Sequence, residues 1–313
     1  MQIFDESPVL ESEIDRLGHM NVQCYMARAG KANGQLLESV GLTRQLCETH
    51  AATFRQVDVY CRFHREQFAG TVLQVLGGLL DLNDHGAKFY LEIRNPAGNQ
   101  VAATFIIESA LVTLAERKLI EFPDNIGAAK AEPMQIPEYG KPRSIKLEPP
   151  RADVTLQELQ SRVIDLGALG MMSGRFERTV EASECDSDGY FREGGNLMFG
   201  GKPPAQDDDD DSFGPPILRT DEGHRFGWAI LETRSILLNV PRAGDLVSSI
   251  GADISIARKS RCSRRWTFDV TTGELLGIND AVAVALDLDA RRAIEIPASV
   301  RSVIEQNHLP QYA

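Results

Sequence analysis

The chain has 313 residues, a formal net charge of −12 and five cysteines. This length predicts about two domains, and the acidic excess disfavours a general nucleic-acid or anionic-membrane surface. The odd cysteine count without a CxxC pair indicates reduced thiols. The N-terminal residues lack the pattern of a signal peptide, and no stretch is long enough to span a membrane. We therefore expect a soluble, cytoplasmic protein with neither a nucleic-acid nor a membrane partner.

The first third of the chain predicts one long helix followed by strands. Apolar residues follow helical spacing between a short motif and the stop signal Gly41, at Val22, Tyr25, Met26, Ala29, Leu36, Leu37 and Val40. From Val57 to His64 apolar and polar residues alternate, which is typical of a strand. Residues 71–80, 88–94 and 101–114 continue as strands between Gly- and Asn-containing turns. A helix followed by an antiparallel meander predicts an α+β domain whose sheet wraps the helix.

The rest of the chain predicts a linker and a second set of strands. Five prolines lie between residues 124 and 174, which indicates an extended linker with a short helix near 156–166. Further strands are predicted at 176–184, 228–239, 245–256, 264–271 and 278–288. Where a second long helix would stand, glycines, prolines and the aspartates Asp207–Asp211 predict a solvated, disordered acidic insertion near 200–216.

Several short segments recur at a nearly constant offset. Ala69-Gly70-Thr71 returns as Ala243-Gly244-Asp245, and the segment 117–123 returns as 291–297, both 174 residues later. In-register repeats of this kind indicate two copies of one domain. We therefore predict a first domain at 1–125, a linker at 126–174 and a second domain at 175–313.

A compact motif precedes the predicted long helix. It reads Asp15-x-x-Gly18-His19-Met20-Asn21-x-x-x-Tyr25. This pattern resembles the D-x-x-G-H-x-N-x-x-x-Y signature of hot-dog-fold thioesterases of the 4-hydroxybenzoyl-CoA thioesterase type. The segment 64–71 is similar to the family's turn after a strand, and 266–285 to its last hairpin. The resemblance implies a double hot dog, with two antiparallel sheets that each wrap a central helix.

The resemblance also implies roles for the motif residues. Asp15 would attack the thioester or activate a water molecule, and the two mechanisms stay open. His19 and Asn21 would orient the motif or the substrate. The backbone N–H groups from Met20 to Val22 would hold the carbonyl oxygen at the helix start, and Tyr25 would line the substrate site. The structural alternative is that Asp15 only caps the helix and that His19 is a buried turn residue whose hydrogen bonds are satisfied.

The second copy keeps only part of this motif. Asp186 and Gly189 remain, but Tyr190 stands in place of His19 and Arg192 in place of Asn21. We therefore expect one working site, in the first copy.

A dense basic cluster lies in the second copy, at a predicted turn between strands. It comprises Arg258, Lys259, Arg261, Arg264 and Arg265. Arginine and lysine bind phosphate well, so Arg258, Lys259 and Arg261 are candidates to hold the phosphates of coenzyme A. The alternative is a solvated hairpin tip.

Other residue patterns predict little additional chemistry. His64 and Glu66 are candidates for a second acid or base, although residues at strand ends often only face solvent. The run of aspartates lacks the spacing of a calcium loop, and the histidines lack metal-site spacing, so no metal and no cofactor are expected. The chain has neither GxSxG nor GxGxxG, which disfavours a serine hydrolase or a dinucleotide enzyme.

Together these patterns predict an acyl-CoA thioesterase that releases a free acid and CoA, and whose pseudo-dimer could form a homo-oligomer. One alternative is a hot-dog hydratase or dehydratase acting on acyl thioesters. Another is a non-catalytic acyl-CoA-binding protein, which the incomplete second motif favours.

Overall fold

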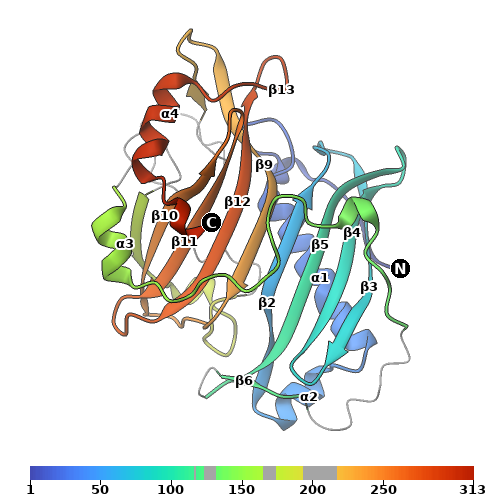
Figure 1. Cartoon of the computed structure of the whole chain (residues 1–313). Coiled ribbons are helices and arrows are strands. Elements are labelled where there is room, and N and C mark those ends of the chain that lie inside the picture. Colours follow the sequence, from blue (N-terminus) through green and yellow to red (C-terminus); the bar gives the residue numbers. More distant parts are fainter. Residues whose placement is uncertain (116–117, 123–131, 165–173, 193–216) are drawn as a thin grey trace. The chain divides into compact units, whose positions relative to one another are not determined.

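The computed structural model describes residues 1–115, 118–122, 132–164, 174–192 and 217–313. The described residues form two compact units, coloured along the sequence in Figure 1. The first unit contains Met1–Arg143 and Arg234–Asn239, and the second contains Ser144–Thr233 and Val240–Ala313. In this described part of the chain, no helix has both the length and the apolar character needed to cross a membrane.

The first unit is an antiparallel sheet with one long helix. Its main elements are β1 (Gln2–Pro8), α1 (Val22–Ser39), α2 (Arg44–Thr49), β2 (Ala52–Phe63), β3 (Val72–Asn83), β4 (Gly86–Asn95), β5 (Gln100–Thr113) and β6 (Leu119–Ile120). The strand order is β1, β3, β4, β5, β2, and β6 pairs with β5. The predicted helix and meander are confirmed. Strand β1 was not predicted, because an edge strand with mostly exposed side chains carries no apolar alternation.

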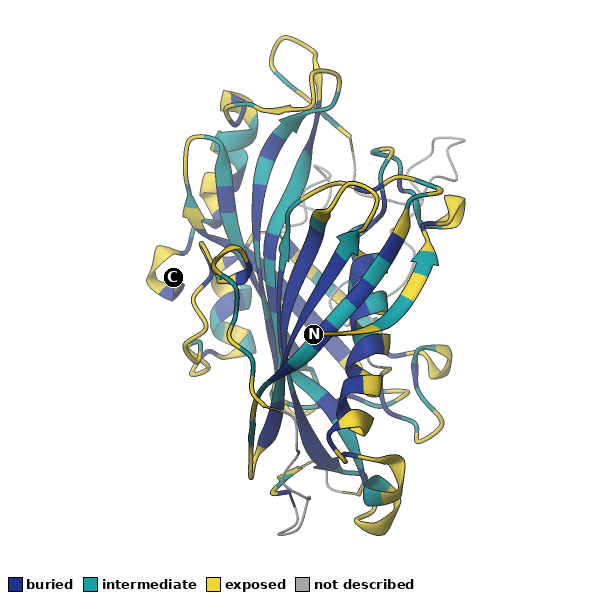
Figure 2. Ribbon diagram, turned by 90° about the vertical axis from the view of Figure 1, so that its right-hand side faces the viewer, coloured by how far each residue is buried: buried dark blue, intermediate teal, exposed yellow. Residues whose placement is uncertain are grey.

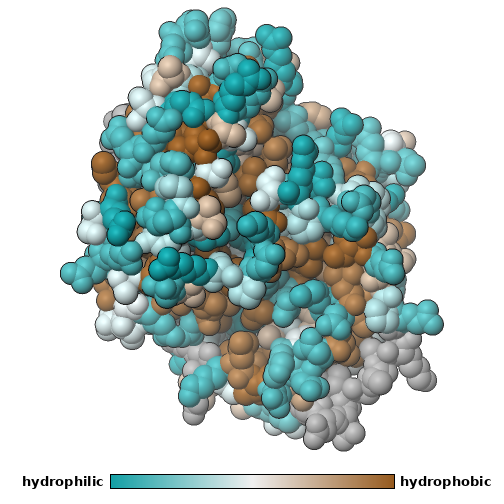
Figure 3. Space-filling model, viewed as in Figure 1, coloured by the Kyte–Doolittle hydropathy of each residue, from teal (hydrophilic) through white to brown (hydrophobic). Residues whose placement is uncertain are grey.

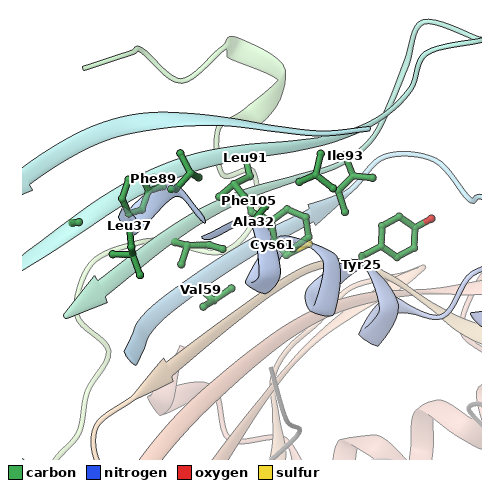
Figure 4. Close-up of a cluster of buried hydrophobic side chains, with 14 of the residues drawn as sticks. Tyr25, Ala32, Leu37, Val59, Cys61, Phe89, Leu91, Ile93 and Phe105 are labelled. Atoms are coloured by element: carbon green, nitrogen blue, oxygen red, sulfur yellow. The ribbon is translucent and has the colours of Figure 1, made fainter. Parts of the chain in front are cut away.

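Helix α1 packs on one face of this sheet, which we call the inner face (Figure 4). Its buried side chains meet apolar residues of all four long strands, including Val59, Cys61, Leu73, Val75, Phe89, Leu91, Ile93, Phe105 and Ile107. A Cβ atom at Gly77 of β3 would lie 2.8 Å from Leu36 Cδ1, so glycine permits this close approach. Figure 2 shows the resulting buried positions along the strands and the helix. This core fixes the start of α1, which comes directly after the Asp15–Asn21 motif.

The second unit contains a similar sheet with shorter helices. Its elements are α3 (Leu156–Arg162), β7 (Gly174–Thr179), β8 (Leu218–Arg219), β9 (Arg225–Leu237, shared with the first unit), β10 (Leu246–Ile256), β11 (Ser260–Asp269), β12 (Leu275–Asp287), β13 (Arg292–Ala293) and α4 (Ala298–Ile304). The strand order is β9, β12, β11, β10, β7. The expected short helix in the linker is confirmed as α3. The strand expected to reach Glu184 ends at Thr179, and residues Ala182–Glu184 form a 3-10 turn.

The strands of the two units repeat each other in register, although they are recorded as one antiparallel sheet and not as the two separate sheets that were predicted. Gly77, Leu91 and Phe105 are aligned across β3, β4 and β5. Residues 251, 265 and 279, each 174 positions later, are aligned in the same way across β10, β11 and β12. Irregularities in pairing after residues 79 and 93 also recur after 253 and 267. The offset found in the sequence therefore describes equivalent positions in two equivalent sets of strands.

The inner face of the strands differs in polarity between the two units. In β4 the inner face carries Phe89, Leu91 and Ile93, whereas the equivalent positions in β11 are Ser263, Arg265 and Thr267. A polar face provides little hydrophobic stabilisation for an amphipathic helix. Among the described residues, a long helix packed on the inner face of a sheet is observed in the first unit. The second helix position and the predicted acidic insertion fall in 193–216, outside the described residues.

The described parts of the predicted linker pack on the units. Met134 N–H donates to the carbonyl of Leu79 (2.8 Å), and a Cβ atom at Gly140 would lie 2.3 Å from the hydroxyl of Tyr90. The segment 134–141 thus lies on the outer face of the first sheet, where Figure 3 shows apolar atoms over β4 and β5. In the second unit, the buried carboxylate of Glu232 accepts the N–H groups of Ser144 and Ile145 at 3.0–3.2 Å.

Candidate active site

The motif before α1 forms a tight loop. Asp15 N–H donates to the carbonyl of His19 (3.0 Å), and Gly18 N–H donates to the carbonyl of Asp15 (2.9 Å). Gly18 has a φ of +81°, a left-handed conformation that glycine adopts without strain. The Oδ1 atom of Asn21 accepts the N–H of Gln23 (2.9 Å) and thereby caps α1. Residues 15–21 therefore form a loop that is closed by backbone hydrogen bonds and ends at the N-cap of α1.

Two hydrogen bonds hold the Asp15 carboxylate within this loop. Asp15 is only 7 % exposed. Oδ1 accepts the N–H of Leu17 (2.9 Å), and Oδ2 accepts the side-chain amide of Asn21 (3.1 Å). Asn21 therefore holds the carboxylate with its Nδ2 atom and the helix start with its Oδ1 atom. The N-cap of α1 is Asn21 and not Asp15, so the capping role considered for Asp15 is wrong.

His19 lies between two carboxylates. Its Nδ1 atom is 3.9 Å from Asp15 Oδ1 and 3.3 Å from the carbonyl oxygen of Met20. Its Nε2 atom is 3.5 Å from Oε1 of Glu66. The ring is mostly buried, whereas the Glu66 side chain is 37 % exposed. Both ring nitrogens thus face oxygen atoms, and one side of the group stays open to solvent.

Glu66 reaches the motif because backbone hydrogen bonds join the two segments. Met20 N–H donates to the carbonyl of Gln67 (2.8 Å), and the Tyr25 hydroxyl donates to the carbonyl of Arg65 (3.3 Å). His64, the other candidate on this segment, is not part of the group. Its Nε2 atom lies 3.1 Å from the hydroxyl of Thr104, and burial lowers the pKa of its imidazole.

The start of α1 offers one backbone donor for a developing oxyanion. The N–H groups of Met20 and Asn21, which were expected to help, donate instead to the carbonyls of Gln67 and Glu13, both at 2.8 Å. Among the described residues, the Val22 N–H has no hydrogen-bond acceptor. It stands at the N-terminus of an 18-residue helix, where the helix dipole favours negative charge. Val22 is therefore the remaining candidate of the three.

The side chains of Met20 and Tyr25 belong to the core. They are 1 % and 3 % exposed, and the Tyr25 ring packs edge-on against Phe63 with centroids 5.5 Å apart. Cys24 lies on the first turn of α1, and burial raises the pKa of its thiol to about 11, with a further increase from Glu13. At neutral pH this thiol is protonated, which makes it a poor nucleophile.

The equivalent loop of the second unit has the same backbone and different chemistry. Asp186 N–H donates to the carbonyl of Tyr190 (2.8 Å), and Gly189 N–H donates to the carbonyl of Asp186 (3.1 Å). The buried Tyr190 accepts a hydrogen bond from Arg242 Nη2 (2.6 Å). Arg192 donates to the carbonyls of Ser183 and Cys185. The loop is retained, and the groups equivalent to His19 and Asn21 are absent from it.

The basic cluster is dispersed. The expected turn covers only Arg258 and Lys259, because Arg261, Arg264 and Arg265 belong to strand β11. Arg258 is exposed and pairs with Glu295 (2.9 Å), and Lys259 Nζ donates to the carbonyl of Ala293 (3.0 Å). Arg261 and Arg264 are buried and pair with Asp253 and Asp280 at 2.6 and 2.7 Å.

Two exposed apolar residues flank the active-site loop. Leu10 and Phe68 are 55 % and 52 % exposed. The segments that carry them are joined by hydrogen bonds between Val9 and both Gly70 and Thr71. In the second copy the equivalent positions hold Glu181 and Arg242. Among the described residues, no group of three or more His, Cys, Asp or Glu side chains is arranged to hold a metal ion.

Comparisons with known proteins identify related sequences and structures. Residues 9–129 match the family model of the thioesterase-like superfamily. A search of curated proteins gave no match.

Among solved structures, the chain resembles the 12:0-ACP thioesterase from Umbellularia californica, with 11 % identity, a TM-score of 0.65, and coverage of 90 % of this chain and 94 % of that one. A protein from Lactobacillus plantarum named as a putative oleoyl thioesterase has 12 % identity, a TM-score of 0.60, and coverage of 91 % and 96 %. An acyl-ACP thioesterase from Bacteroides thetaiotaomicron VPI-5482 has 9 % identity, a TM-score of 0.58, and coverage of 89 % and 96 %. The first unit thus matches the thioesterase-like superfamily, and the chain has the hot-dog fold of these thioesterases.

Proposed function

We propose that the protein hydrolyses an acyl thioester to a free acid and a thiol, with acyl-CoA as the substrate. It would work as a fused double hot dog with one catalytic motif, at Asp15. The match of residues 9–129 to the thioesterase-like superfamily supports thioester hydrolysis. The names of the similar solved structures favour an acyl-carrier-protein thioester as a second candidate substrate.

The observation that carries the proposal is the geometry of Asp15 at the start of α1. A carboxylate held by two hydrogen bonds lies in the loop that ends at the Val22 N–H. Asp15 either takes a proton from a water molecule that attacks the carbonyl carbon or attacks that carbon itself. In both cases the carbonyl oxygen gains negative charge, which the Val22 N–H and the helix dipole stabilise.

His19 and Glu66 extend this group toward solvent. Collapse of the tetrahedral intermediate breaks the carbon–sulfur bond, and the departing sulfur then needs a proton. The imidazole of His19 lies between Asp15 and Glu66, at 3.9 and 3.5 Å, so it can carry the proton from one side of the site to the other. The exposed side chains of Leu10 and Phe68 offer apolar contacts to a substrate that enters here.

The test is release of free thiol from a panel of acyl-CoA and acyl-carrier-protein thioesters. We expect wild-type turnover with at least one member, and Asp15→Asn should lower kcat at least ~100-fold, which is ~2.7 kcal/mol of barrier. Turnover within about threefold of wild type would show that Asp15 is not the catalytic group. Hydration of an enoyl thioester without thiol release would instead support the hydratase alternative.

Asp186→Asn is the matched control. The Asp186 Oδ1 atom accepts the N–H groups of Asp188 and Tyr190, both at 3.0 Å, so its substitution disturbs an equivalent loop. We expect a loss of stability similar to that of Asp15→Asn and turnover close to wild type.

A further inference from the structure

Arg28 connects helix α1 to the segment that precedes the active-site loop. Its guanidinium donates to both carboxylate oxygens of Glu13, at 3.4 and 2.8 Å. It also donates to the carbonyl and hydroxyl oxygens of Ser7, at 3.3 and 2.6 Å, and to the carbonyl of Pro8 at 2.8 Å. The Arg28 side chain is 11 % exposed. A guanidinium with this many acceptors holds its partners in one arrangement, because its donors have a fixed planar geometry.

Glu13 connects Arg28 to Asn21 and, through Asn21, to the Asp15 carboxylate. Its carboxylate also accepts the N–H of Leu10 (2.8 Å), and its backbone carbonyl accepts the N–H of Asn21 (2.8 Å). Asn21 in turn donates to Asp15 Oδ2 (3.1 Å). A chain of hydrogen-bonded groups therefore leads from Arg28 through Glu13 and Asn21 to the Asp15 carboxylate. The groups before Asp15 in this chain contribute no atom that the proposed reaction changes.

The second unit has an equivalent ion pair beside its incomplete motif. Arg178 donates to Glu184 (2.5 Å), and the backbone carbonyl of Glu184 accepts the N–H of Arg192 (2.9 Å). The Arg178 side chain is also 11 % exposed, and the two carboxylates are 18 % and 22 % exposed. The two ion pairs are alike in the burial of the arginine, but Arg28 comes from α1 and makes five side-chain hydrogen bonds, whereas Arg178 comes from β7 and its buried Nε and Nη2 atoms have no partner among the described residues. They also differ in the residue that the glutamate carbonyl holds, because Arg192 stands where the first copy has Asn21.

We propose that Arg28 is a positioning residue for the catalytic carboxylate, acting through Glu13 and Asn21. The inference rests on the proposed thioesterase function of Asp15. Without the guanidinium, Glu13 and the loop gain freedom, and the carboxylate spends less time in the productive geometry. Small displacements of a catalytic group cost up to about 100-fold in rate. The Arg28 side chain is only 11 % exposed and its guanidinium donates to Glu13, Ser7 and Pro8, so the loss should appear in kcat and leave KM nearly unchanged.

The experiment compares Arg28→Met with Arg178→Met in the full chain. On the best substrate of the thioester panel, we expect Arg28→Met to lower kcat about 10- to 100-fold with KM within about threefold of wild type. Arg178→Met should keep kcat within about twofold. The melting temperature should fall further for Arg28→Met than for Arg178→Met, because Arg28 makes more hydrogen bonds, so the split between kcat and KM is the measurement that identifies a positioning role.

Conservative variants keep the test decisive if a methionine variant does not fold. Arg28→Lys retains the charge without the planar fork, and it should lower kcat, whereas Arg178→Lys should not. Unchanged kcat in the folded Arg28 variants would overturn the inference, and so would equal losses of kcat at both positions. Absence of turnover in the wild-type protein would instead refute the proposed function, so the two failures are distinguishable.

Discussion

Glu66 provides the sharpest test of the active-site geometry. Its Oε1 atom is 3.5 Å from His19 Nε2, and its side chain is 37 % exposed. Two unit charges at this distance interact by about 5 kcal/mol at an effective dielectric constant near 20. Solvent at the exposed carboxylate screens this interaction, which leaves about 1 kcal/mol. We therefore expect Glu66→Gln to lower kcat about fivefold.

A double-mutant cycle measures this coupling. Steady-state kinetics of Glu66→Gln, His19→Gln and the double variant give the interaction energy between the two side chains. If they act together, the double variant should be little worse than His19→Gln alone. Glu108→Gln is the control, because the Glu108 side chain is 34 % exposed and pairs with Lys88 at 2.8 Å. Multiplicative effects of the two active-site substitutions, or a Glu66→Gln enzyme within about twofold of wild type, would refute the reasoning.

Two further predictions concern the second unit. Burial raises the pKa of Asp253 to about 6 despite its ion pair with Arg261. The folded protein therefore binds the proton of the Asp253 carboxyl more tightly than the unfolded chain does. The free energy of unfolding that this proton contributes should fall as the pH rises from about 4 to 6. Urea unfolding of wild type and Asp253→Asn across that range should show it, and a pH-independent difference would contradict it. For the phosphate hypothesis, replacing Arg258 and Lys259 by glutamine should raise KM for acyl-CoA and leave kcat unchanged, whereas an unchanged KM would count against a phosphate site. Arg261 should be kept in that experiment, because its removal leaves buried Asp253 unpaired, at a cost of about 3–5 kcal/mol.

The periodicity and local motifs of the sequence were sufficient to predict most of the secondary structure of the first unit. The helical spacing after Asn21 predicted α1 close to its observed bounds. Alternation from Val57 predicted β2 except for its first five residues, and turn signals delimited β3 to β5. The loop from Asp15 to Asn21 is equally local, because the hydrogen bonds that close it join residues near each other in the chain. The repeat offset of 174 was also readable, since equivalent strands keep equivalent lengths and turns.

Contacts between segments that are distant in the sequence could not be predicted from it and were found only in the tertiary structure. Glu66 meets His19 because Met20 pairs with Gln67, and no spacing rule in the sequence predicts which of His64 and Glu66 turns toward the motif. The Arg28–Glu13 pair was not predicted for the same reason.

The basic cluster shows that residues close in the sequence need not share a surface. Its closely spaced basic residues suggested one charged surface, but successive side chains of a strand point to opposite faces. Whether each arginine then meets solvent or a buried carboxylate depends on which residues the neighbouring strands and the C-terminal segment bring alongside. For Arg261 that partner is Asp253 on β10, and for Arg264 it is Asp280 on β12. Composition and order along the chain determined the elements, and strand pairing decided which side chains share an environment.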